Sequence, residues 1–173
     1  MKFDLNDRST IKKMVEIWIN LSDLLESFGA RRVNIPEGIS EPLFCLAMAD
    51  LNHEIVRCTE NITQANTSFD CYNLKTNKRI QVKACSVPKD LSSFGPKSVF
   101  DEIYLVYLPN IKINGAFSIY QITPDKIYTH KVNKNQTLKD QQLEGKRPRF
   151  SIYKDIILPN NLQPIYTGDI SSW

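Results

Sequence analysis

A hairpin pattern lies near the middle of the sequence, where Thr67 to Cys85 reads TSFDCYNLKTNKRIQVKAC. The segments Ser68 to Leu74 and Arg79 to Cys85 alternate between apolar and polar side chains, which is typical of strands with one buried face. Lys75 to Lys78, between them, has the composition of a polar turn. The stretch therefore predicts two antiparallel strands joined by a turn.

The second predicted strand places two functional side chains on one face. Since strand side chains alternate, Gln81 and Lys83 project to the same side, whereas Ile80 and Val82 project to the other. If Asp70 ends the first strand on the Gln81 side, a carboxylate, an amide and an ammonium group converge. The structural alternatives are a turn residue for Asp70 and an exposed, snorkelling lysine for Lys83.

Such a convergence suits a divalent cation and a phosphate. Hard cations such as Mg²⁺ prefer oxygen ligands, which Asp70, the amide oxygen of Gln81 and the backbone carbonyl of Val82 would supply. Lys83 would position the attacking water and stabilise the charge that develops on the phosphate. The pattern therefore predicts a site for phosphodiester hydrolysis.

This set of residues resembles the catalytic signature of the PD-(D/E)XK nucleases, the family that includes most type II restriction endonucleases. Asp70 matches the first acid of the signature, and Gln81 and Lys83 match its second half. The sequence departs from the usual pattern in Phe69, where proline is common, and in Gln81, where an acid is common. Some restriction enzymes of the family carry glutamine there, although a neutral ligand attracts the cation less than a carboxylate does.

A second helix is predicted within the stretch from Gly38 to Ala49, with Ser40 as its N-cap and Glu41 and Pro42 in its first turn. The resemblance implies a role for Glu41, because many of these nucleases carry a glutamate on the helix before the catalytic hairpin. There it acts on the metal through a water molecule. The alternative is that Glu41 only complements the helix dipole.

An amphipathic helix is predicted near the start of the chain, capped by Ser9 or Thr10 and ending at about Phe28, before Gly29. Its apolar residues recur at helical spacing and are Ile11, Val15, Trp18, Leu21, Leu25 and Phe28. The helix is interpreted either as core scaffold or, if the stripe is wider than one core needs, as part of a dimer interface.

Basic residues are concentrated in the second half of the chain. Residues 1–60 carry 7 basic and 10 acidic side chains, whereas residues 71–154 carry 15 basic and 6 acidic ones. This asymmetry favours contact with a polyanion around the candidate site, although a solvated charged face would give the same composition.

Two arginine-containing segments are candidates for DNA binding. Arg31 and Arg32 follow the first helix, and Lys146, Arg147 and Arg149 lie in a basic region of about residues 131–154. Arginine can grip phosphates or present a fork to guanine in the major groove. The alternative for both segments is a set of exposed charges.

Further strands are predicted after the hairpin. Ser86 to Ser98 contains Pro88, Gly95 and Pro96 and is expected to be a loop. The nearly continuous apolar run from Phe100 to Leu108 is typical of a central strand covered on both faces, and Ala116 to Ile122 alternates like another strand.

Length and composition indicate one globular domain. The chain has 173 residues, of which 42% are hydrophobic and 24% charged, and it contains no apolar run long enough to span a bilayer. Its N-terminus lacks an apolar signal segment, so a cytoplasmic location is expected. The four cysteines form no C-x-x-C pair, which favours free thiols over a structural zinc site.

The order of these features resembles the PD-(D/E)XK core over about residues 38–123. It implies an α/β fold with three layers, in which helices flank a central mixed β-sheet within a single nuclease domain. The resemblance further implies a Mg²⁺-dependent type II restriction endonuclease that acts as a homodimer on a short palindromic site in double-stranded DNA. The alternatives are a repair or recombination nuclease of the same fold and a non-catalytic nucleic-acid-binding module.

Overall fold

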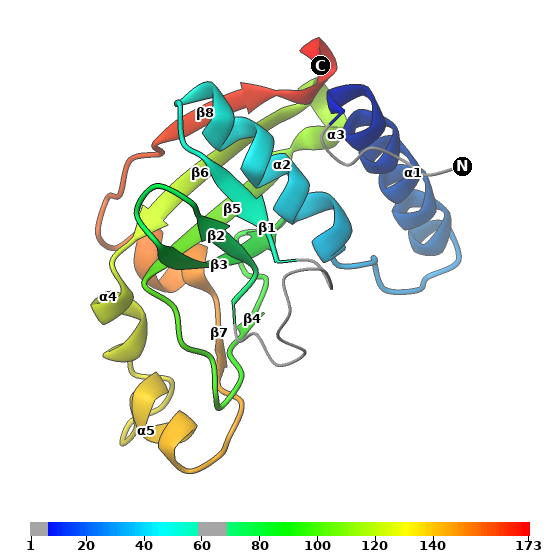
Figure 1. The fold of residues 1–173 in the computed structure, drawn as a ribbon. Coiled ribbons are helices and arrows are strands. Elements are labelled where there is room, and N and C mark those ends of the chain that lie inside the picture. Colours follow the sequence, from blue (N-terminus) through cyan, green and yellow to red (C-terminus); the bar gives the residue numbers. More distant parts are fainter. Residues whose placement is uncertain (1–6, 59–68) are drawn as a thin grey trace.

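The computed structural model describes residues 7–58 and 69–173 of the chain (Figure 1). Residues Thr67 and Ser68 of the predicted hairpin lie outside the described residues. In chain order the elements are α1 (Arg8–Ser27), α2 (Glu37–Asp50), β1 (Ile55–Arg57), β2 (Cys71–Asn73), β3 (Lys78–Cys85), β4 (Ser92–Ser93), β5 (Glu102–Asn110), α3 (Ile111–Asn114), β6 (Ala116–Ile122), α4 (Pro124–Tyr128), α5 (Leu138–Leu143), β7 (Arg149–Phe150), a π-helical turn (Tyr153–Ile157), β8 (Tyr166–Asp169) and a final 3-10 turn (Ile170–Ser172).

The main sheet is mixed and has six strands in the order β1-β2-β3-β5-β6-β8. Strand β3 pairs antiparallel with β2 and parallel with β5, and the remaining neighbours are antiparallel. A parallel pair needs a crossover connection, and the segment between β3 and β5 provides it. This crossover contains β4, which pairs with β7 in a separate two-stranded ribbon.

Two apolar cores cover the two faces of the main sheet, which confirms the predicted three-layer α/β fold. Helices α1 and α2 pack on one face, where Leu43 and Phe44 of α2 meet Val82 of β3. On the other face, residues of α4, α5 and the π-helical turn pack against Cys85 of β3 and Leu105 of β5. Alternate residues of β3 therefore enter different cores, as strand geometry requires.

Several strand predictions are confirmed. The hairpin of β2 and β3 forms with Cys71 opposite Ile80, and its turn contains Asn77 in the left-handed conformation that asparagine tolerates. The predicted central strand is β5, with six consecutive buried residues from Ile103 to Leu108. The predicted strand from Ala116 to Ile122 is β6.

Three short strands depart from the sequence predictions. The segment after α2 forms β1 at one edge of the sheet, and the C-terminal tail supplies β8 at the other; no strand is predicted in either. The expected loop from Ser86 to Ser98 contains β4. Each of these strands has four residues or fewer, so they are too short for alternation to reveal them.

The predicted helix starts were wrong by a few residues. Helix α1 is capped by Asp7, whose carboxylate accepts from the backbone N–H of Ser9, and not by Ser9 or Thr10. Helix α2 begins at Glu37 after Pro36, so Ser40 is not its N-cap. Glu41 consequently lies in the second turn of α2, beyond the turn where the helix dipole acts most strongly.

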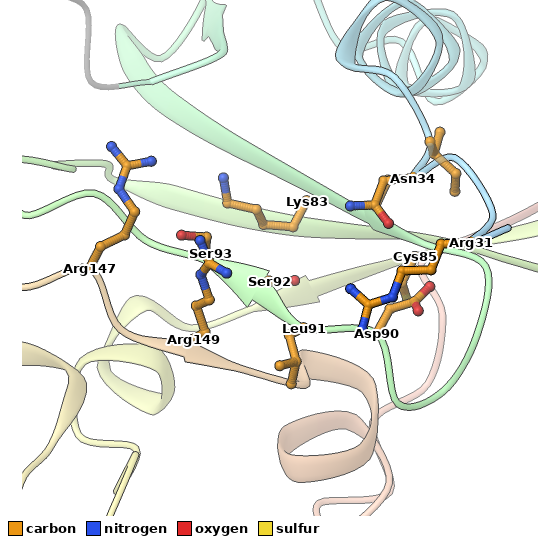
Figure 2. Close-up of a pocket in the computed structure, with 12 residues that line it drawn as sticks. Arg31, Asn34, Lys83, Cys85, Asp90, Leu91, Ser92, Ser93, Arg147 and Arg149 are labelled. Carbon is orange, nitrogen blue, oxygen red and sulfur yellow. The ribbon is translucent and has the colours of Figure 1, made fainter.

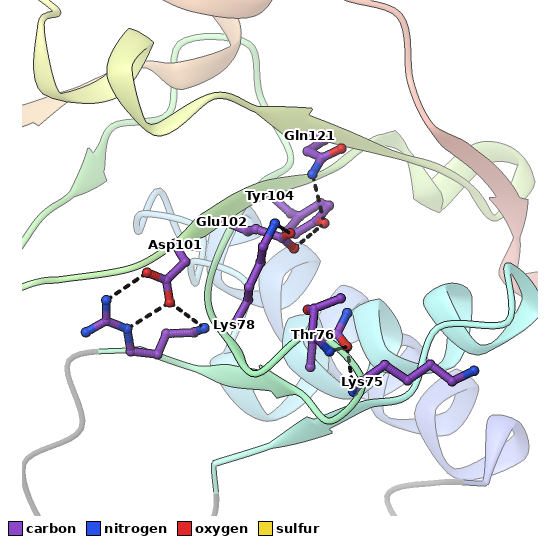
Figure 3. Close-up of polar contacts among 9 residues, drawn as sticks. Lys75, Thr76, Lys78, Asp101, Glu102, Tyr104 and Gln121 are labelled. Atoms are coloured by element: carbon purple, nitrogen blue, oxygen red, sulfur yellow. Dashed lines mark hydrogen bonds and ion pairs between the residues drawn. The ribbon is translucent and has the colours of Figure 1, made fainter.

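Polar side chains connect the start of β3 to the start of β5 (Figure 3). Lys78 forms a 2.9 Å ion pair with Glu102, and Arg79 a 2.7 Å pair with Asp101. The hydroxyl of Tyr104 donates to Glu102 at 2.8 Å. These contacts help to set the register of the strand that carries Gln81 and Lys83.

Within the described ranges, no helix combines the length and apolar character that a bilayer-spanning segment needs. All four cysteines are free thiols, two buried and two half-buried.

Candidate active site

Asp70 is positioned by the hairpin and faces the middle of β3. It precedes β2, and its backbone N–H donates to the carbonyl of Ile80 at 2.9 Å. Its carboxylate oxygen Oδ2 accepts from the backbone N–H of Val82 at 2.8 Å and from the amide Nε2 of Gln81. The structure therefore brings Asp70 and Gln81 together, as the sequence predicted.

The contact between Asp70 and Gln81 is made through the amide nitrogen of Gln81. The Gln81 side chain is only 3% exposed, so its hydrogen bond holds the Asp70 carboxylate from the buried side of the site. The predicted metal ligand was the amide oxygen of Gln81, which would have to replace the nitrogen by rotation of the amide group. In the arrangement that the structure has, Gln81 orients Asp70.

The backbone of Val82 also faces Asp70. In a strand, the N–H and C=O groups of one residue point to the same edge. Because the N–H of Val82 meets Asp70, its carbonyl faces the same side, beyond the end of β2. The placement suits the predicted role of this carbonyl as a cation ligand.

Glu41 reaches the same place from α2 and is only 8% exposed. Its carboxylate oxygen Oε2 accepts from Nε of Arg57 at 2.9 Å and from a terminal nitrogen of Arg57 at 2.8 Å. Burial raises the pKa of Glu41 to about 7; the hydrogen bond from Arg57 opposes this shift, and the nearby charge of Asp70 adds to it. Glu41 therefore changes its charge near neutral pH.

Lys83 lies between the carboxylates of Asp70 and Glu41 on one side and the crossover segment that carries Phe94 on the other. Burial lowers its pKa, whereas the charges of Asp70 and Glu41 raise it. Burial likewise raises the pKa of Asp70, and the charge of Lys83 lowers it. The ammonium nitrogen also lies 5.7 Å from the ring centre of Phe94, so an aromatic face supports the cation from the crossover segment.

These groups enclose a cavity of about 150 Å³. It is lined by Ile35, Glu37, Ser40, Glu41, Asp70, Val82, Lys83 and Ala84. Three carboxylates, of which Glu37 is exposed, a strand backbone and an ammonium group thus surround a space that suits a hydrated cation and a phosphate oxygen.

A larger groove of about 600 Å³ adjoins the cavity and shares Ile35, Lys83 and Ala84 with it. Figure 2 shows Arg147 and Arg149 on one side of this groove and Arg31 and Asn34 on the other, with Lys83 between them. The cavity therefore opens onto a groove rich in arginine.

Three of the five predicted DNA-binding residues line this groove, namely Arg31, Arg147 and Arg149. The other two lie outside its lining. Arg32 pairs with Glu26 of α1 at 2.6 Å, and Lys146 pairs with Glu144 at 2.5 Å. Each therefore has an acidic partner close by in the chain.

Sequence reasoning missed three residues of the site. Arg57, which holds Glu41, lies at the end of the undetected strand β1, and no local pattern marks it. Asn34 lies in the loop that carries Arg31, and Glu37 is the first residue of α2. The last two could have been proposed once the loop and the start of the helix were placed correctly.

Comparison with known proteins gives two matches. The chain matches the family model described as Bsp6I restriction endonuclease over residues 3–159. It is also 35% identical to the type II restriction enzyme Bsp6I of Bacillus sp. (strain RFL6) over 169 residues, which cover 95% of this chain and 89% of that enzyme. No solved structure is significantly similar to the chain. The matched segment includes every residue that lines the cavity.

Proposed function

Because the chain belongs to the Bsp6I restriction endonuclease family, we propose that the cavity around Asp70, Glu41 and Lys83 is where this type II restriction endonuclease hydrolyses DNA. Membership of the family supplies the enzyme class. The residues, the metal and the assembly are our proposals. The observation that carries them is the burial of two carboxylates and an ammonium group in one cavity, which opens onto an arginine-lined groove.

The metal that fits the cavity best is Mg²⁺. Asp70, Glu41 and the Val82 carbonyl offer only oxygen, which suits a hard cation. Among the described residues, no three acidic, histidine or cysteine side chains are already grouped as a metal cage. Mg²⁺ fits this sparse ligand set because it keeps several of its waters and is typically held by one or two carboxylates together with substrate phosphate.

Each residue of the cavity has a distinct role in this proposal. Asp70 binds the cation directly, the Val82 carbonyl assists, and Glu41 acts through a water molecule. Gln81 orients Asp70 through its N–H donor and is a weak ligand if its amide rotates. When Mg²⁺ is bound, its charge would polarise the scissile phosphate and lower the pKa of a nearby water.

Lys83 acts on the reaction itself. Its ammonium group positions the attacking water and stabilises the charge that accumulates on the phosphate oxygens. The water oxygen forms a bond to phosphorus while the bond from phosphorus to the 3′ oxygen breaks. One proton leaves the water and one is taken up by the 3′ oxygen, so the products are a 5′-phosphate and a 3′-hydroxyl.

The groove is proposed to hold the DNA. Arg31, Arg147 and Arg149 bind phosphates or base edges, with the main sequence-reading groups in the basic region of about residues 131–154. One cavity cuts one strand, so cleavage of both strands at a palindromic site calls for two copies related by a two-fold axis. We further propose that the enzyme works in the cytoplasm.

Digestion of phage DNA tests this proposal. Purified protein is incubated with the DNA in Mg²⁺ or in EDTA, and the products are separated on a gel. Discrete fragments with 5′-phosphate ends in Mg²⁺, and intact DNA in EDTA, are the expected result. Cleavage that persists in EDTA would contradict the metal assignment, and a continuous smear would contradict cleavage at a defined site.

A further inference from the structure

Helix α1 is apolar on two sides, and only one of them packs against the core. Its inner stripe of Ile11, Val15 and Trp18 is buried. Helix α1 lies at the edge of the molecule (Figure 1). A second apolar stripe on it is exposed, and its members are Ile17 (58% exposed), Leu21 (46%), Leu24 (57%) and Phe28 (81%). Counting about 100° per residue, this outer stripe lies roughly 120° around the helix from the inner one. A helix with two separate apolar stripes is normally covered on both.

The outer stripe has the same residue spacing whether it is followed from its N-terminal or from its C-terminal end. Its residues are separated by four, three and four positions, the 3-4 spacing of a helix–helix seam. In an antiparallel pair of α1 helices related by a two-fold axis, Ile17 meets Phe28 of the other copy, and Leu21 meets Leu24. Such an isologous contact is self-complementary, as a two-fold dimer requires.

Charges along the helix permit this contact. Asn20, Ser27 and the half-buried Leu25 flank the stripe and are uncharged. The acidic residues of this half of the helix point elsewhere, since Asp23 pairs with Lys112 and Glu26 pairs with Arg32. Two copies can therefore approach without bringing like charges face to face.

The stripe is continuous with the DNA groove. Phe28 ends it, and the loop that follows carries Arg31 and Asn34 into the groove lining. Contact between two α1 helices would thus place the arginine-bearing loops of both copies close to one two-fold axis. Two cavities could then act on the two strands of one duplex.

We propose that two copies of the chain associate through the outer faces of α1, in antiparallel orientation, with Leu21 of each copy against Leu24 of the other. This inference rests on the proposed function for its biological purpose, but its geometry stands on the helix alone. The seam from Ile17 to Phe28 is only about 16 Å long, so the interface is smaller than the roughly 800 Å² per partner of a standard one. The free dimer is therefore expected to dissociate on dilution.

Sedimentation equilibrium over roughly 1 to 100 µM protein tests the interface with a pair of charge variants. One variant is Leu21→Glu with Leu24→Glu, and the other is Leu21→Lys with Leu24→Lys. Each alone should raise the dimer dissociation constant by about tenfold or more, because like charges then face each other. An equimolar mixture should recover dimers, since every facing pair becomes Glu–Lys. Leu143→Asp, at an exposed leucine of α5, is the matched control and should leave dimerisation unchanged.

Three results would overturn the proposal: a wild-type protein that is monomeric throughout, a double-Glu variant that dimerises like wild type, or a mixture no more dimeric than its components. DNA cleavage measured on the same preparations separates the two proposals. Cleavage by a wild type whose dimer is insensitive to both variants would remove the α1 interface and leave the function in place. A dimer that responds to the charge variants but cuts no DNA would support the α1 interface and remove the proposed function.

Discussion

At Gln81 the chain uses an amide where the nuclease signature usually has an acid. The amide N–H holds Asp70 in place, and a carboxylate at position 81 would lack this donor. The amide also adds no further negative charge to a cavity that already contains Asp70, Glu41 and Glu37. The neutral side chain therefore stabilises the metal-free site but contributes less attraction to the cation.

Gln81→Glu should lower the Mg²⁺ concentration needed for half-maximal cleavage, because a carboxylate is the stronger ligand for a hard cation. It should also lower the free energy of unfolding in EDTA, since a buried carboxylate then faces Asp70 without a hydrogen bond. Cleavage titrations with Mg²⁺ and urea denaturation in EDTA check the two effects. An unchanged Mg²⁺ requirement would show that residue 81 does not act on the cation.

Glu41 makes the site sensitive to pH near neutrality. Its pKa of about 7 in the folded protein is above the ordinary value of 4.5. The folded state therefore binds the proton more tightly, so this contribution to stability is complete at low pH and is lost as the pH rises from about 4.5 to 7. Only ionised Glu41 can act on a cation. Its fraction therefore rises over the same pH range in which the folded protein loses this contribution to its stability.

Arg57→Ala should move this transition to higher pH, because Arg57 lowers the pKa of Glu41. The Mg²⁺ requirement of the wild type should rise as the pH falls below about 7, and in the variant this rise should begin at a higher pH. Arg57→Lys should restore part of the shift. The measurement is the Mg²⁺ concentration for half-maximal cleavage between about pH 6 and 9. If Arg57→Ala cleaves less but its pH profile is not shifted, Arg57 has only a structural role and does not set the pKa of Glu41.

Among the elements, those with a long repeating pattern were predictable from sequence. Helix α1, the hairpin strand β3, the buried strand β5 and the alternating strand β6 each contain enough residues for their period to be recognised. The short strands form because a neighbouring strand offers hydrogen-bond partners: β1 pairs with β2, β4 with β7, and β8 with β6. Their existence depends on contacts between segments distant in sequence, which a local pattern does not contain.

The crossover between β3 and β5 supplies the wall behind Lys83. Phe94 is fully buried there and stacks on Phe150, with ring centres 5.4 Å apart. Phe94→Ala should lower the free energy of unfolding by about 3–5 kcal/mol, since it leaves a cavity in the second core. Urea denaturation measures this change, with Leu143→Ala as the exposed control, for which a change within about 0.5 kcal/mol is expected. A loss below about 1 kcal/mol for Phe94→Ala would mean that the crossover is not packed as described.

For the whole molecule, the grouping of the proposed catalytic residues was easier to predict than the assembly of the arginine-lined groove. Asp70, Gln81 and Lys83 lie within one hairpin, so alternation and spacing bring them together. Glu41 followed from the resemblance to known nucleases. Arg31 and Arg147 face one groove only because the loop after α1 and the segment before β7 converge beside β3, a long-range arrangement that their sequence context does not reveal.

Arg31→Gln should weaken duplex binding and make it less dependent on salt. Each phosphate contact contributes about 0.9 to the slope of log affinity against log salt, so the slope should fall by about that amount. Binding is measured by fluorescence anisotropy in EDTA, which prevents cleavage. Lys75→Gln is the control, because Lys75 lies on the hairpin turn (Figure 3), does not line the groove, and is exposed beside Glu54. Equal slopes for Arg31→Gln and the wild type would show that Arg31 makes no phosphate contact.

DNA cleavage is proposed to take place in the cavity around Asp70, Glu41 and Lys83, and Asp70→Asn tests this most directly. The variant keeps the size of the side chain and removes its charge, and Asp125→Asn, at an exposed residue of α4, is the matched control. Cleavage of phage DNA in Mg²⁺ should fall by at least about 10³-fold in Asp70→Asn, with circular dichroism and DNA binding in EDTA like those of the wild type, and should be unchanged in Asp125→Asn. Full cleavage by a folded Asp70→Asn protein would contradict the account and place the active site elsewhere.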